Sequence, residues 1–84
     1  MTEWSDAQLM RYLEDSLPAA EHEMARTLLA TYGERIFERE VTRVRRVLLQ
    51  SCDGSLDRLQ KLVALAKVDY RDVLIRDPGP GTPP

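Results

Sequence analysis

The feature that most constrains this 84-residue chain is an uninterrupted apolar repeat between Ser55 and Arg76. Its apolar residues recur at alternating steps of three and four, which keeps them on one side of an α-helix at about 100° per residue. No glycine or proline interrupts the segment, and Pro78 follows it. Ser55 is a suitable N-cap because its hydroxyl can accept a hydrogen bond from a first-turn amide. The pattern predicts a helix over residues 55–76 with an apolar side made of Leu56, Leu59, Leu62, Val63, Ala66, Tyr70, Val73 and Leu74.

Three apolar residues of the same segment fall outside that apolar side. Leu65, Val68 and Ile75 lie beside the charged Asp72 on the opposite part of the helix. Single exposed apolar side chains are common on soluble proteins, so plain solvent exposure is one interpretation. The other is contact with a partner helix or with a second copy of the chain. Under the second interpretation, Leu65, Val68, Asp72 and Ile75 form a protein interface.

Three further helices are predicted before this segment. Ser5 and Gln8 have the spacing of a capping box, which marks a helix start. Pro18 closes the first helix and suits the first turn of the second. Gly33 is the predicted stop of the second helix, because glycine readily adopts positive φ; a single long helix through Gly33 is the alternative. The four predicted helices span residues 6–16, 18–32, 34–51 and 55–76.

This pattern predicts an all-α fold, either a small four-helix bundle or an orthogonal helical array. The helices form a single domain over residues 1–76, and the Pro/Gly-rich residues 77–84 are expected to form a disordered tail. A chain of this length buries only about 60% of its unfolded surface, so its stability is marginal. The lone Cys52 offers no disulfide within the chain. Small chains often gain stability by oligomerising, so we expect a homodimer.

Composition limits the cellular location and the classes of partner that we expect for this chain. The net charge of −2 argues against a surface that attracts nucleic acid as a whole. The single cysteine and the polar, acidic stretch after Met1 favour a reducing, cytoplasmic location. No run approaches the roughly 20 apolar residues of a membrane span, so no membrane contact is expected. Arginine outnumbers lysine, which is typical of proteins from GC-rich bacterial genomes.

Charge is concentrated on the predicted third helix. Arg35, Arg39, Arg43 and Arg46 would fall within an arc of about 80° on that helix. Aligned guanidinium groups can bind phosphates or carboxylates, so this arginine stripe is a candidate anion-binding or partner-binding site. A nucleic-acid accessory protein is therefore an alternative function, although no aromatic residue is interleaved and no helix-turn-helix spacing is present. An acidic protein surface or plain solvation would also account for the stripe.

No constellation of residues indicates catalysis, a cofactor, a metal ion or a small-molecule ligand. His22 is the only histidine and has no neighbouring residues spaced as metal ligands. Gly33 and Gly54 are isolated, so no phosphate-binding loop is present. A small enzyme is the least favoured function. The leading hypothesis is a non-catalytic protein–protein interaction module that associates with itself.

Overall fold

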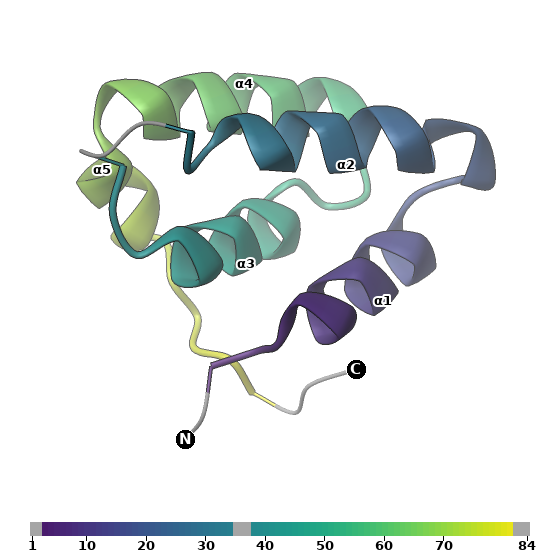
Figure 1. Cartoon of the computed structure of the whole chain (residues 1–84), viewed down its shortest axis with the longest axis horizontal. Coiled ribbons are helices and arrows are strands. Elements are labelled where there is room, and N and C mark those ends of the chain that lie inside the picture. Colours follow the sequence, from purple (N-terminus) through teal and green to yellow (C-terminus); the bar gives the residue numbers. More distant parts are fainter. Residues whose placement is uncertain (1–2, 35–37, 82–84) are drawn as a thin grey trace.

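The computed structural model describes residues 3–34 and 38–81. These residues form five α-helices and one short 3-10 helix, and no strand occurs among them (Figure 1). The predicted all-α fold is confirmed. The elements are α1 (Asp6–Ser16), the 3-10 helix η1 (Ala19–Glu21), α2 (His22–Thr31), α3 (Val41–Ser51), α4 (Leu56–Val68) and α5 (Tyr70–Leu74).

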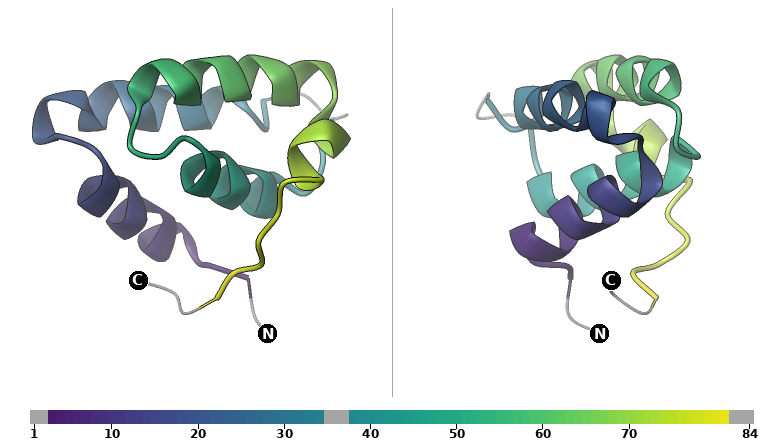
Figure 2. Two further views of the ribbon diagram at one scale, coloured as in Figure 1. Left: turned by 180° about the vertical axis from the view of Figure 1, so that it is seen from behind. Right: turned by 90° about the vertical axis from the view of Figure 1, so that its right-hand side faces the viewer.

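The helices form two layers. α2 and α4 pack against each other in one layer, and α1 packs against α3 in the other (Figures 1 and 2). α3 also contacts α4 and α5, which makes it the central helix of the array. The short α5 turns away from the end of α4 and packs on α3 (Figure 2).

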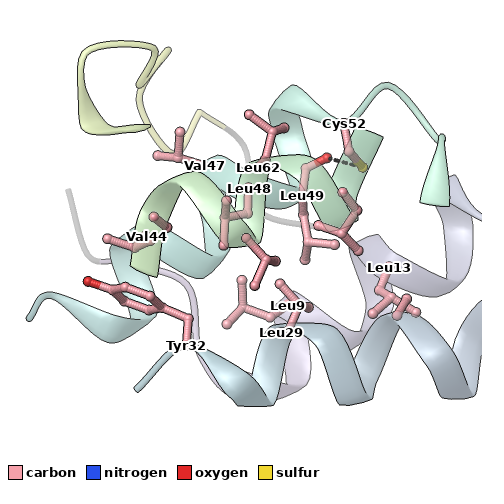
Figure 3. Close-up of a cluster of buried hydrophobic side chains, with 14 of the residues drawn as sticks. Leu9, Leu13, Leu29, Tyr32, Val44, Val47, Leu48, Leu49, Cys52 and Leu62 are labelled. Carbon is pink, nitrogen blue, oxygen red and sulfur yellow. Dashed lines mark hydrogen bonds between the residues drawn. The ribbon is translucent and has the colours of Figure 1, made fainter. Parts of the chain in front are cut away.

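The hydrophobic core fills the space between these layers, as the close-up in Figure 3 shows. Leu13 of α1, Tyr32 after α2 and Leu48 of α3 have no exposed surface. Cys52 is buried with them, and its thiol donates to the carbonyl oxygen of Leu49 at 3.2 Å. Burial raises the pKa of this thiol, which favours its neutral form, and the side chain packs within the core.

The predicted helix ends near Ser5, Gly33 and Ser55 are confirmed. The Ser5 hydroxyl accepts from the Gln8 amide, and the Gln8 side chain accepts from the Ser5 amide, as a capping box requires. Gly33 has a φ of +113°, which ends the second helix. The Ser55 hydroxyl accepts from the amide of Arg58 and caps α4.

The third helix begins later than predicted. It was expected over residues 34–51, but α3 starts at Val41, and residues 38–40 are not helical; residues 35–37 lie outside the described part of the chain. We attribute this late start of α3 to the contacts of Glu38. Its carboxylate accepts from the Gly33 amide at 2.9 Å and from Lys67 of α4 at 2.9 Å. These contacts hold the segment before α3 against Gly33 and α4, and Glu40, the N-cap of α3, has a φ of +50°.

The fourth predicted helix is also interrupted. Residues 55–76 form α4 and α5, separated at Asp69, whose backbone is extended (φ −153°, ψ 99°). The Asp69 carboxylate accepts from the amide of Arg71 and caps α5. The break lets the chain turn over α3, where Val73 is completely buried. The apolar periodicity does not predict this break, because a capping residue at a polar position leaves the spacing of the apolar residues unchanged.

Residues 77–81 descend from α5 (Figure 2) and contact both the N-terminal segment, through Trp4, and α3, through Gln50. The indole Nε1 of Trp4 donates to the carbonyl oxygen of Pro80 at 3.0 Å. The disorder expected over residues 77–84 stays a prediction, and residues 82–84 lie outside the described part of the chain.

Candidate functional site

The predicted interface residues lie on both sides of the Asp69 break. Val68 ends α4 with 86% of its surface exposed, and Ile75 follows α5 with 82% exposed. Asp72 is exposed on α5, whereas Leu65 is half-buried against the core. We call Val68, Asp72 and Ile75 the α4–α5 surface. Because α5 has turned, Val68 and Ile75 belong to two different helices and not to one continuous face.

A pocket of about 260 Å³ opens at the same break. This volume is below the roughly 300–1,000 Å³ of small-molecule sites and is suited to one side chain of a partner. Val68 is the residue that belongs both to the pocket wall and to the α4–α5 surface. The lining residues come from the end of α2, the segment before α3, and the α4–α5 junction: Tyr32, Glu38, Ala66, Lys67, Val68, Asp69, Tyr70 and Arg71.

The polar groups of the pocket are engaged with one another. Lys67 donates to the Thr31 carbonyl oxygen and forms an ion pair with Glu38, whose side chain is only 2% exposed. Tyr32 donates its hydroxyl proton to the Arg39 carbonyl oxygen at 2.7 Å. Burial, together with the charge of Glu38, raises the pKa of Tyr32 to about 12. The phenol therefore stays protonated at neutral pH and cannot remove a proton from a substrate.

The predicted arginine stripe is not assembled on one helix face. Arg39 precedes α3, and Arg35 lies outside the described residues. Arg43 is on α3 and forms ion pairs with Asp77 and Glu40. Arg46 is also on α3, but only 1% of its surface is exposed. Among the described members of the stripe, Arg39 and Arg43 are accessible and Arg46 is not, and the nucleic-acid hypothesis stays a prediction.

Arg46 is the centre of a buried polar cluster that joins both ends of the chain to α3. Its guanidinium group donates to Glu3, to Asp77 and to the side-chain oxygen of Gln50. Burial alone would lower the pKa of Arg46, but the hydrogen bonds to Asp77 and Glu3 more than offset it and raise the pKa. The hydrogen bonds from Arg46 are also the main reason that the pKa of Asp77 is far below its usual value.

Sequence reasoning missed this cluster. Its partners are 43 and 31 residues from Arg46 along the chain. One local signal was present: Leu49 lies only about 60° from Arg46 around the helix, so a buried leucine borders the arginine side. A leucine there indicates that this side of α3 is covered by another part of the chain.

Comparisons with protein-family models, with curated proteins and with solved structures gave no significant match. No helix within residues 3–34 and 38–81 is both long enough and apolar enough to span a bilayer. In the same residues, no cluster of three or more His, Cys, Asp or Glu side chains is arranged to hold a metal ion.

Proposed function

We propose that this chain is a non-catalytic interaction module that pairs with a second copy of itself through the α4–α5 surface. The observation that carries the proposal is the exposure of Val68, which lines a pocket of side-chain size, together with that of Ile75 directly after α5. The other exposed large apolar residue of the described chain, Met24, lies on α2 and is less exposed, at 56%.

Charge favours a second copy as the partner. Arg71 and Asp72 are adjacent, exposed and of opposite sign on α5. Arg71 donates its Nε–H to Asp69 of the same chain at 3.1 Å, and in a two-fold symmetric contact, where the same patch meets itself, its remaining N–H groups can face the partner's aspartate. A patch of mixed sign is therefore complementary to its own copy, whereas a patch of one sign would repel it.

The expected dimer is weak. Burying one Val or Ile side chain contributes about 1.5–3 kcal/mol. Two such residues from each copy give about 6–12 kcal/mol, against an association cost of about 4–15 kcal/mol. The two ranges largely cancel, and the most favourable difference, about 8 kcal/mol, corresponds to a Kd of about 1 μM, so the concentrations to test run from about 1 μM to 1 mM.

Analytical ultracentrifugation across that concentration range tests the proposal. The expected result is a reversible monomer–dimer equilibrium that Val68→Glu or Ile75→Glu shifts to monomer, with an unchanged helical circular dichroism spectrum. Met24→Glu is the matched control, since it places the same charge on an exposed apolar position of another helix. A strict monomer at 1 mM would contradict self-association. A dimer lost only in the Met24→Glu variant would contradict the choice of surface.

A further inference from the structure

The segment that follows α5 makes a set of specific polar contacts, which we treat as a second recognition site. We call residues 77–81 the C-terminal strap. It descends from α5 and crosses the N-terminal segment (yellow in Figures 1 and 2). The side chains that hold it, here named the strap site, are Trp4, Arg43, Arg46 and Gln50.

The strap site binds one carboxylate with several donors. Asp77 accepts from Nη1 and Nη2 of Arg46 at 2.8 and 3.0 Å, and from Nε of Arg43 at 2.9 Å. The backbone amide of Gly79 donates to the same carboxylate at 2.7 Å, which folds the strap around it. Two arginines that converge on one carboxylate form a geometry that discriminates strongly against a neutral group.

Two further donors bind the backbone of the strap. Trp4 Nε1 donates to the Pro80 carbonyl oxygen at 3.0 Å, and Gln50 Nε2 donates to the Gly79 carbonyl oxygen at 3.2 Å. Contacts to carbonyl oxygens require a particular backbone path and not a particular side chain. Gly79 supplies that path with a φ of +88°, which other residues adopt only with strain.

The strap has no large apolar side chain that could be buried in a core. Its attachment therefore depends on polar contacts, and these must offset the entropy lost when five residues become ordered. With the strap displaced, the strap site would present two guanidinium groups, an indole N–H and an amide, which are carried by α3 and the N-terminal segment.

We infer that the strap site is a binding site for a short partner segment in which an aspartate is followed by proline and glycine, and that the strap competes for this site from within the chain. Because the strap is tethered, its effective concentration is in the millimolar range, so it keeps the site closed to weak ligands. The inference concerns a different surface from the proposed dimer contact and does not depend on it.

The test measures binding of a labelled, end-capped hexapeptide with the sequence of residues 76–81, RDPGPG, to the full-length chain. Two variants loosen the strap while leaving every strap-site residue native. Asp77→Asn removes the carboxylate, and Gly79→Ala strains the strap without a clash, since nothing lies within 4 Å of an added Cβ. Asp53→Asn is the matched control, because it neutralises an exposed carboxylate that belongs neither to the strap site nor to the α4–α5 surface.

Fluorescence anisotropy of the peptide reports binding, and the emission of Trp4, the single tryptophan, reports occupancy of the site. We expect both loosened variants to bind the peptide at least 10-fold more tightly than the native chain and the Asp53→Asn control do. A peptide with asparagine in place of aspartate should bind at least 10-fold more weakly. Equal affinity for all chains, equal affinity for both peptides, or no binding at 1 mM would each overturn the inference.

Discussion

Replacing Arg46 by methionine is the most direct test of the structural argument. Methionine fills a similar elongated space but donates no hydrogen bonds. The change removes five hydrogen bonds to three partners and leaves the carboxylates of Glu3 and Asp77 without their shared cation. Of the two carboxylates, Asp77 dominates the expected cost, since its side chain is 11% exposed whereas that of Glu3 is 32% exposed and better screened by water.

The expected loss in the free energy of unfolding follows from the known contributions of buried hydrogen bonds and ion pairs. A hydrogen bond to a charged group contributes about 1.5–3 kcal/mol, so two of the Asp77 bonds alone give about 3–6 kcal/mol. Removal of one partner from a buried ion pair costs about 3–5 kcal/mol, which agrees. The free energy of unfolding of an 84-residue domain is about 4–13 kcal/mol, so the variant should lose a large fraction of it. We expect Tm to fall by at least about 12 °C.

Urea unfolding followed by circular dichroism and by Trp4 emission measures this loss. Arg58→Met is the matched control, because its ion pair with Asp53 is exposed on both sides and should contribute less than about 1 kcal/mol. Neutralising the stranded carboxylates as well, with Glu3→Gln and Asp77→Asn added to Arg46→Met, should restore at least about 1 kcal/mol. If Arg46→Met costs no more than Arg58→Met, the buried cluster does not stabilise the fold and the reasoning is refuted.

Three further predictions test the core, the Gly33 turn and the Asp77 carboxylate. Leu48→Ala should lower the free energy of unfolding by about 2–5 kcal/mol in urea titrations, because its side chain is completely buried; a cost below 1 kcal/mol would contradict that burial. Gly33→Ala should cost about 1–3 kcal/mol, since φ is +113° and the new Cβ would lie 2.9 Å from Val41 Cγ1; an unchanged Tm would contradict the turn. The pKa of Asp77 is lowered in the folded chain, so its contribution is complete above the ordinary aspartate pKa of about 3.9 and is lost as the pH falls below it. The stability difference between the native chain and Asp77→Asn should therefore be constant from neutral pH to about pH 5 and shrink below about pH 4, and a difference that grows on acidification would contradict the assignment.

Helix ends governed by neighbouring residues could be predicted from the sequence. The capping box of Ser5 and Gln8, the stop at Gly33 and the cap at Ser55 each involve residues within a turn of one another. The apolar periodicity of residues 55–76 correctly placed Leu59, Leu62, Val63, Ala66 and Val73 in the core, because the period of an α-helix is a local property.

The remaining features depend on residues that are distant along the chain. The late start of α3 follows from Glu38, which binds Lys67 29 residues away. The burial of Arg46 depends on Glu3 and Asp77, and each of these acids is an ordinary polar residue when its own neighbours are considered. Helical periodicity gave the direction in which Arg46 points but could not show that both ends of the chain cover it.

The strap and the α4–α5 surface are close enough in sequence to be coupled. Ile75, which belongs to the α4–α5 surface, is two residues from Asp77, which anchors the strap. α5 has only five residues, too few to be stable as an isolated helix. Its position is therefore set by the packing of Val73, Tyr70 and Leu74 on the core and by Asp77 on Arg46, and release of the strap removes the second of these restraints.

This coupling predicts that self-association depends on the strap. Asp77→Asn and Gly79→Ala should each raise the Kd of the dimer several-fold, although neither residue belongs to the α4–α5 surface, because the position of Ile75 then becomes less defined. Coupling between binding events is reciprocal, so dimer formation should in turn weaken binding of the RDPGPG peptide. Sedimentation of both variants measures the effect, with Asp53→Asn as the control. Asp72→Asn is not used as a control, because Asp72 lies on the proposed interface. An unchanged dimer Kd would mean that core packing alone holds α5 in place and that the two surfaces act independently.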